Sequence, residues 1–260
     1  MRVLLLCGGR GIIDPDTHTR IPKCLLKIGN KPLIWHVMKL FSSYGHTEFV
    51  LSMGAGGDLI KNYFLNAFEL NHDIELKINS KEVKSLNRIP EEDWVVKLIN
   101  TGISASTGAR IARCERYLCH EPFFISYTDI LADVNISNLL DHHNLSNKLL
   151  TVTGVNPPSR FGTFYLEDSK LKGYKSDALL NMKSSKINGG FMVANEDIFK
   201  KLSPITECNL ELEIFDQLLA EEQLNLFTHD GFWRNVDTER DLNYLQNLYT
   251  INKRPWLGIN

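Results

Sequence analysis

The chain has 260 residues, of which 43% are hydrophobic, and its formal net charge at pH 7 is −2. This length allows a full hydrophobic core in one large α/β domain or two small ones, and we expect a single domain over residues 1–260. A charge so close to zero gives no electrostatic reason to expect a nucleic-acid or anionic-membrane partner, so any recognition of phosphate must be local.

Apolar runs rich in Val, Ile, Leu and Phe alternate with segments of helical spacing, which is typical of βα units around a mostly parallel sheet. The predicted strands are Val3–Cys7, Phe49–Met53, Glu75–Ile78, Phe123–Tyr127, Leu149–Val155 and Gly190–Val193. The predicted helices are Pro32–Tyr44, Asp58–Leu65, Gly108–Tyr117, Leu210–Leu219 and Asp237–Leu248. The polar, irregular region 70–94 is expected to leave the sheet, and it is a candidate arm between subunits.

The first predicted strand runs directly into a glycine-rich turn. Gly8, Gly9 and Gly11 can bring backbone N–H groups close to phosphate oxygens, because glycine lacks a Cβ atom and tolerates positive φ. The turn does not close with Gly-Lys-Ser/Thr as a P-loop would, and it does not lead straight into a helix as a dinucleotide fingerprint would. The Pro-Lys pair that contains Lys23 strengthens this weak signal into a predicted phosphate site.

Two acidic residues are candidate metal ligands. Asp129 follows the predicted strand Phe123–Tyr127, and the carboxyl end of a parallel strand lies at the crevice where α/β sheets bind ligands. Mg²⁺ takes one or two carboxylates together with phosphate oxygens and water. Helix capping is the competing interpretation, equal in weight for Asp129 and preferred for both Asp133 and Asp237 when each is taken alone.

Two further polar segments are candidate binding sites. Thr107, Gly108 and Arg110 begin a predicted helix, where a guanidinium and backbone N–H groups can meet one phosphate; an ordinary surface arginine is the alternative, and the local sequence slightly favours it. Asn188 and Gly189 precede the predicted strand Gly190–Val193, which indicates close approach of the backbone either to a ligand or to a neighbouring strand.

Several other kinds of protein are excluded. The five cysteines form no C-x-x-C pair, and their odd number argues against a closed disulfide framework. The eight histidines include no H-E-x-x-H spacing, and no G-x-S-x-G elbow is present, so zinc and serine-hydrolase chemistry are not expected. The apolar N-terminus is too short for a signal peptide, and no apolar run approaches the roughly 18 residues of a membrane span. We expect a cytoplasmic protein with reduced, mostly buried thiols.

Taken in order, these residues resemble the sugar-nucleotidyltransferase family, most closely its glucose-1-phosphate cytidylyltransferase branch. The family opens with a strand, then G-G-x-G-T-R, then P-K, and this chain is similar at Gly8, Gly9, Gly11, Pro22 and Lys23. Further similar segments are 31–36 (K-P-L-I-W-H), 107–110, 157–162, 187–191 (I-N-G-G-F), 231–233 (G-F-W), 237–241 and 255–256. The resemblance covers nearly the whole chain.

The resemblance implies an α/β, Rossmann-like nucleotidyltransferase fold of GT-A-like type, with a mixed, mostly parallel central sheet flanked by helices. It implies transfer of a nucleotidyl group from a nucleoside triphosphate, CTP in this branch, to a phosphate monoester, with release of pyrophosphate. Lys23 would lie on the triphosphate, Asp129 and Asp237 would hold Mg²⁺, and the protein would form homo-oligomers. The implied nucleotide-binding residues are Leu6, Cys7, Gly8, Gly9, Arg10, Gly11, Lys23, Thr107, Gly108 and Arg110.

The chain departs from the family pattern at three places. Residues 12–13 are Ile-Ile where the family has Thr-Arg, so Arg10 or Arg20 is expected to supply the missing cation. Residues 128–130 read Thr-Asp-Ile instead of G-D-G, which keeps the carboxylate but loses the access that glycine gives. The Glu-Lys-Pro expected upstream of I-N-G-G-F, whose lysine the family uses on the sugar phosphate, is absent.

These departures lie around the acceptor and the loop, and they leave two hypotheses. The first is an active cytidylyltransferase whose acceptor is another sugar phosphate or a non-sugar phosphate, such as a phosphorylated amino acid derivative. The second is a catalytically inactive homologue that binds a nucleotide or a partner protein. A nucleoside triphosphate hydrolase lacks an identifiable base. The candidate acceptor-binding residues are Arg160, Lys175, Lys183, Lys186, Asn188 and Gly189.

Overall fold

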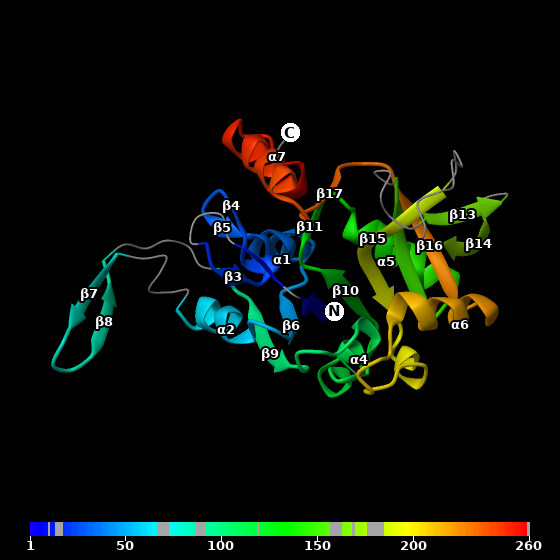
Figure 1. Cartoon of the computed structure of the whole chain (residues 1–260), viewed down its shortest axis with the longest axis horizontal. Coiled ribbons are helices and arrows are strands. Elements are labelled where there is room, and N and C mark those ends of the chain that lie inside the picture. Colours follow the sequence, from blue (N-terminus) through cyan, green and yellow to red (C-terminus); the bar gives the residue numbers. More distant parts are fainter. Residues whose placement is uncertain are drawn as a thin grey trace.

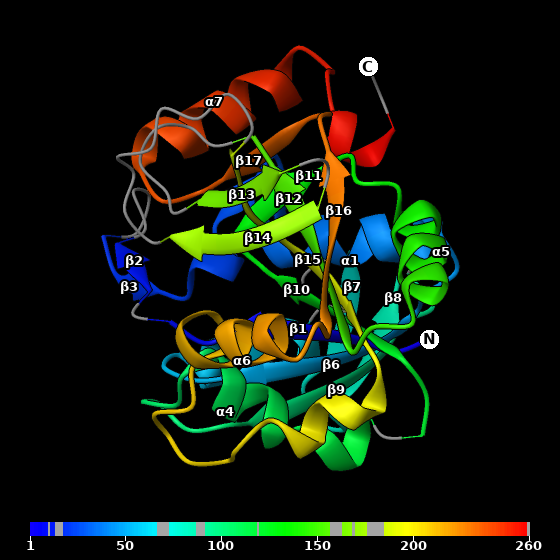
Figure 2. The ribbon, with the colours of Figure 1, turned by 90° about the vertical axis from the view of Figure 1, so that its right-hand side faces the viewer.

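The computed structural model describes residues 1–9, 11–13, 18–66, 73–86, 92–118, 120–156, 163–167, 170–175 and 185–258. At 85, 163–167, 174, 175 and 185 the description covers the backbone alone. A large central sheet has helices against both of its faces, as Figure 1 and Figure 2 show from two directions.

The central sheet is mixed and has nine strands. Its strands are β1 (Val3–Cys7), β6 (Glu48–Met53), β9 (Val95–Asn100), β10 (Phe123–Tyr127), β12 (Leu150–Val155), β13 (Thr163–Glu167), β14 (Lys170–Lys175), β15 (Ser185–Ala194) and β16 (Leu224–His229). Four neighbours, in the order β10, β1, β6 and β9, run parallel. β15 is antiparallel to β10, β12 and β13, whereas β16 is parallel to β12. The expected mixed sheet is therefore confirmed.

β1 lies at the centre of the parallel strands, and its five residues are all buried. Side chains alternate between the two faces of a strand. Val3 and Leu5 accordingly belong to one hydrophobic cluster, while Leu4 and Leu6 belong to a second. This burial on both sides explains why the opening of the sequence is a continuous apolar run.

The helices of the described residues differ from the predicted ones in their bounds, and two predicted helices are divided. They are α1 (Leu33–Ser43), α2 (Gly57–Leu65), α4 (Thr107–Ala112), α5 (Ile136–Ser146), α6 (Phe215–Ala220) and α7 (Glu239–Thr250), with a π-helical turn at Leu210–Ile214 and 3₁₀ turns at Lys23–Leu25, Glu115–Tyr117, Glu196–Lys200 and Pro255–Leu257. The predicted helix Gly108–Tyr117 is thus two pieces. In Figure 2, α1 and α7 lie above β1, β6 and β9, whereas α4 lies below them.

Two capping interpretations are wrong. Asn135, not Asp133, caps α5, since its side chain accepts a hydrogen bond from the backbone N–H of Asn138. Thr238, not Asp237, caps α7, through a reciprocal capping box with Asp241. The carboxylate of Asp237 therefore does not cap α7.

The strands β1 and β10 begin and end where the sequence predicts, and β6 and β12 differ by one residue. The predicted strand Gly190–Val193 is the inner part of the longer β15, which begins at Ser185. The sequence reading did not identify β9, β16 or α5. β9 has no fully buried residue, and α5 buries only three side chains, so neither carries a strong periodic signal.

Four short two-stranded ladders complete the part of the fold that the structure describes. They are β2 (Ile12–Ile13) with β3 (Arg20–Ile21), β4 (Lys27–Ile28) with β5 (Lys31–Pro32), β7 (Ile74–Lys77) with β8 (Glu82–Ser85), and β11 (Ile130–Ala132) with β17 (Trp233–Asn235). Figure 1 shows the β7–β8 hairpin projecting from the body of the molecule. The prediction that this region leaves the sheet is confirmed.

Two further expectations concern thiols and membrane spans. Cys7, Cys24, Cys114 and Cys208 are buried free thiols, as predicted, whereas Cys119 lies outside the described residues. In the part of the chain that the structure describes, no helix is long and apolar enough to cross a bilayer.

Candidate active site

The glycine turn opens onto a cavity of about 340 Å³ at the carboxyl ends of β1 and β10. The residues that line it include the predicted nucleotide-binding residues Leu6, Cys7, Gly8, Gly9, Gly11 and Lys23 and the predicted metal ligand Asp129. Gly11 has φ +68°, and a Cβ atom there would lie 2.5 Å from the carbonyl oxygen of Ile21, so the turn requires glycine at this point. The glycine turn, Lys23 and Asp129 are thus brought together around one cavity.

Lys23 stands between two carboxylates. Its Nζ lies 2.6 Å from Oδ1 of Asp237 and 3.4 Å from Oδ2 of Asp129. The 3₁₀ turn Lys23–Leu25 buries Cys24. Burial lowers the pKa of Lys23, but the carboxylates of Asp237 and Asp129 outweigh burial and leave that pKa raised. The two acids and the lysine that the sequence singled out are therefore one ion cluster.

Backbone pairing explains how Asp129 and Asp237 converge although they are distant in sequence. The β11–β17 ladder follows Asp129, and the N–H of Val236 donates to the carbonyl oxygen of Asp129 at 2.8 Å. This bond places the next residue, Asp237, beside Asp129. Asn235 then orients Asp237 by donating from Nδ2 to Oδ2 at 2.6 Å.

The surroundings of Asp129 disfavour the charged form of its carboxyl group. Its pKa is raised mainly by burial, with a further contribution from the negative charge of Asp237, and Lys23 opposes both. Two close carboxylates, of which one is partly buried, are stabilised by a positive charge between them. The arrangement is suited to a cation.

Asp129 and Asp237 fit the kind of Mg²⁺ site in which substrate phosphate completes the coordination. Asp129 and Asp237 already share one cation, the Lys23 ammonium, and Mg²⁺ commonly uses one or two carboxylates plus substrate phosphates and water. Among the described residues, no group of three or more His, Cys, Asp and Glu side chains could hold a metal. The donor set therefore matches a site completed by a ligand, not an all-protein cage.

Arg110 lies beneath the glycine turn and is only 4% exposed. Its guanidinium donates to backbone carbonyls of Met53, Gly102 and Ile103 and to the hydroxyl of Thr101, at 2.8 to 3.3 Å. These bonds tie together the ends of β6 and β9. The alternative of an ordinary surface arginine is wrong, and a role on the nucleotide phosphates stays a prediction.

Gly8 and Arg110 are matched in space. A Cβ atom on Gly8 would lie 2.1 Å from Cζ of Arg110, whose hydrogen bonds hold the guanidinium in place. Glycine at this position therefore permits the buried cation to approach the turn. Burial lowers the pKa of Arg110, and the neighbouring charge of Arg113 lowers it further.

Thr107 and Gly108 connect α4 to the segment before α6. The hydroxyl of Thr107 donates to Oε2 of Glu211 at 2.7 Å and accepts from the N–H of Leu210. A Cβ atom on Gly108 would meet Cys208 at 2.8 Å. Their nucleotide role stays a prediction. The sequence reading missed Glu211, whose pKa is raised by burial and which stands in an apolar L-E-L-E-I run.

The predicted acceptor-binding residues are only partly described by the structure. Asn188 accepts from the N–H of Gly190 at 2.9 Å, and the carbonyl of Gly189 accepts from Nε1 of Trp233 at 2.9 Å. Asn188 and Gly189 thus shape a bend in β15 close to β17.

Lys186 donates to Oδ1 of Asn156 at 2.8 Å and forms an ion pair with Asp230. Arg10, Arg160 and Lys183 lie outside the described residues, and Lys175 is described by its backbone alone.

Arg20 is the remaining candidate for the missing loop cation. Its Nη1 lies 3.5 Å from the carbonyl oxygen of Gly11, across the short β2–β3 ladder. This contact keeps the guanidinium beside the glycine turn. It is consistent with the predicted replacement of the family's arginine and does not distinguish Arg20 from Arg10.

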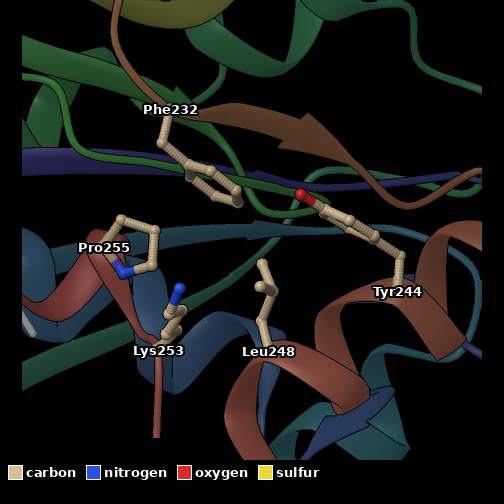
Figure 3. Close-up of a pocket in the computed structure, with 5 residues that line it drawn as sticks. All are labelled: Phe232, Tyr244, Leu248, Lys253 and Pro255. Atoms are coloured by element: carbon tan, nitrogen blue, oxygen red, sulfur yellow. The ribbon is translucent and has the colours of Figure 1, made fainter. Parts of the chain in front are cut away.

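A second hollow, of about 260 Å³, lies against α7. Figure 3 shows Phe232, Tyr244, Leu248, Lys253 and Pro255 around it. No residue of the predicted site lines this hollow.

Comparison with known proteins agrees with the geometry. No protein-family model matches the chain. The chain is 32% identical to the "Probable glucose-1-phosphate cytidylyltransferase" of Bacillus subtilis (strain 168), over 98% of this chain and 99% of that protein. It is also 32% identical to the glucose-1-phosphate cytidylyltransferase of Salmonella typhi, over 98% of each. The solved structure of UTP-bound UGPase from Acinetobacter baumannii matches with a TM-score of 0.73 at 15% identity, over 95% of this chain and 92% of that chain. The predicted nucleotidyltransferase fold is confirmed.

Proposed function

Because this chain belongs to the glucose-1-phosphate cytidylyltransferase family of sugar nucleotidyltransferases, we propose that it transfers CMP from CTP to a phosphorylated acceptor, with Mg²⁺ as cofactor. The observation that carries the proposal is the convergence of Lys23, Asp129 and Asp237 beside the glycine turn. The reaction class is nucleotidyl transfer to a sugar phosphate or a related phosphate monoester. We treat 1–260 as one catalytic domain.

In the proposed reaction, a phosphate oxygen of the acceptor attacks the α-phosphorus of CTP in line. A new P–O bond forms there, the bond to the bridging oxygen of the β-phosphate breaks, and pyrophosphate leaves. The protein's task is to position two anions and to offset their charge. Lys23 and the backbone N–H groups of the glycine turn do this for the triphosphate. Mg²⁺ held by Asp129 and Asp237 would supply further positive charge to the phosphate oxygens.

We further propose that the acceptor differs from glucose 1-phosphate. The Glu-Lys-Pro segment of the resembled family is absent, so another residue must supply the positive charge that offsets the acceptor phosphate. Lys186 is the described candidate, because it lies on β15 two residues before Asn188. Lys175 and Lys183 are the other candidates, with Arg160 also near in sequence.

The test is a panel of phosphorylated sugars and non-sugar phosphates incubated with CTP and Mg²⁺, read by pyrophosphate release. We expect turnover with CTP to exceed that with UTP or dTTP for at least one acceptor, and the Asp129→Asn variant to lose that turnover. No release of pyrophosphate with any acceptor and any nucleotide would contradict the proposal.

A second candidate, a catalytically inactive homologue, is favoured by the absent acceptor lysine and by Ile-Ile in the loop. Such a protein is expected to be stabilised thermally by CTP but to turn over no acceptor. It is also expected to lose little CTP stabilisation when Asp129→Asn is made. An active enzyme is expected to lose Mg²⁺-dependent stabilisation in the same variant.

We also propose that the protein acts in the cytoplasm, where nucleoside triphosphates are made, and forms homo-oligomers. The β7–β8 hairpin supports the second point, because Ile74, Leu76 and Val83 are exposed on it and an isolated hairpin is marginally stable in water. Light scattering would test it: Leu76→Asp is expected to lower the oligomer mass, and an unchanged mass would contradict an inter-subunit role for the hairpin.

A further inference from the structure

We propose that Lys23 occupies the space between Asp129 and Asp237 that a divalent cation would use, so that metal binding requires the lysine to leave. The inference rests on the proposed function, because it concerns the same carboxylates. It adds that Lys23 has two successive partners, first the acids and then the nucleotide.

The contacts around the ammonium carry the argument. Lys23 Nζ lies 2.6 Å from Asp237 and 3.4 Å from Asp129, so it already fills the space at which both carboxylates converge. Asp237 is fixed on its other oxygen by Asn235, at 2.6 Å. A divalent cation that uses both acids must therefore displace the ammonium.

The cavity provides a second place for the lysine. Lys23 lines the same hollow as Gly8, Gly9 and Gly11, whose turn is the proposed phosphate cradle. A triphosphate there offers anionic oxygens to the displaced ammonium. Release of Lys23 from the acids and its capture by phosphate become one exchange of partners.

Linkage gives the consequence. A ligand that draws Lys23 away from the acids raises the affinity of the acids for metal, and the metal raises the affinity for that ligand by the same factor. Without nucleotide, the lysine competes with the metal. The unliganded protein should therefore bind divalent cations weakly.

The experiment measures Mn²⁺ binding without nucleotide or acceptor, from the electron paramagnetic resonance signal of free Mn²⁺. Lys23→Met removes the ammonium and keeps an unbranched side chain. Lys27→Met is the matched control, since Lys27 is an exposed neighbour on β4. We expect at least a tenfold lower Kd for Lys23→Met than for the unmodified protein, and an unchanged Kd for Lys27→Met.

Two further measurements keep the outcome decisive. The double variant Lys23→Met/Asp129→Asn should lose the gain in affinity, which places the metal at these acids. The Lys23→Gln variant, with the Mn²⁺-dependent shift in its unfolding midpoint, covers the case in which the methionine variant folds poorly. A Kd that stays the same or rises when Lys23 is neutralised, or a gain that survives Asp129→Asn, would overturn the inference.

The result is separable from the proposed function. Tighter Mn²⁺ binding in Lys23→Met together with no turnover of any acceptor by the unmodified protein would support the exchange and contradict the transferase. Turnover by the unmodified protein together with unchanged Mn²⁺ affinity in Lys23→Met would support the transferase and contradict the exchange.

Discussion

The two sides of the central sheet differ in how they build their part of the site. On the parallel side, β1 and β10 end at the glycine turn and Asp129, and the backbone fixes the groups that would face a triphosphate. On the other side, β15 runs antiparallel to its neighbours; the side chain of Lys186 contacts Asn156 and Asp230 in neighbouring loops, and that of Asn188 accepts from the N–H of Gly190 in the same strand. The proposed nucleotide site is thus tied to the fold, while the proposed acceptor site depends on side chains that can change without altering the sheet.

The largest expected effect is the loss of an acid of the proposed metal site on the parallel side. Asp129→Asn keeps the size of the side chain but removes a charge from the cluster with Lys23 and Asp237. We expect kcat to fall by about 10³-fold, because a metal contributes several kcal/mol to stabilising transition-state charge. Pyrophosphate release under saturating CTP measures it.

Asp133→Asn is the control for that variant, since Asp133 pairs with His229 at 3.0 Å instead of with Lys23. Its kcat should stay within a few-fold of the unmodified enzyme. Equal losses in the two variants would remove the distinction between the nucleotide side and its surroundings.

The next effect concerns pH and the packing of α1. Burial lowers the pKa of His36 to about 4; its Nε2 lies 3.0 Å from the carbonyl oxygen of Ile28, and its Nδ1 accepts from Trp256. The unfolded chain therefore binds the proton more readily, so stability is present above pH 6.5 and is lost as pH falls from 6.5 to 4. We expect a loss of about 3 kcal/mol across that window.

Chemical denaturation at a series of pH values measures this loss, with His36→Gln as the non-titrating comparison. The variant should show a flatter dependence between pH 6.5 and 4. Parallel curves for the two proteins would show that His36 is not the group responsible.

A smaller effect is expected from the glycine turn. Gly8→Ala places a methyl group against the held guanidinium of Arg110, whereas Gly9→Ala meets no heavy atom within 4 Å. Overpacking of this kind costs about 1–3 kcal/mol, and the Gly9 variant should stay within about 0.5 kcal/mol. Thermal unfolding and CTP affinity both measure it, and equal effects at the two positions would contradict the close approach of Arg110.

The smallest effect is expected on the acceptor side. Lys186→Met should raise the KM for the acceptor about tenfold, the order of one charge-assisted hydrogen bond, and leave the KM for CTP unchanged. Lys200→Met is the control, because Lys200 pairs with Asp197 on an exposed 3₁₀ turn. A change in the KM for CTP alone would place Lys186 on the wrong side of the comparison.

The sequence predicted the parts of the site that follow from short-range chemistry. The end of β1, the glycine turn and Lys23 all lie within the first 23 residues, and they line one cavity in the structure. The capping of α7 by Thr238 was missed, because Asp is also a good cap and the choice depends on the backbone entry to the helix.

The longer-range features were less accessible. The pairing of β11 with β17 brings Asp237 to Asp129, and no spacing rule reveals that ladder. The resemblance to the family suggested only that the two acids share a metal ion. Glu211 was missed because its contact is with Thr107, which is distant in sequence. The edge position of β9 weakened the strand pattern that would have identified it.

The most direct test of the central claim is a crystal structure with CTP and Mn²⁺, read at a wavelength where manganese scatters anomalously. We predict one anomalous peak in contact with carboxylate oxygens of both Asp129 and Asp237 and with the triphosphate, with Lys23 moved onto phosphate oxygens. A peak that contacts neither acid, or a triphosphate bound away from the glycine turn, would contradict the account.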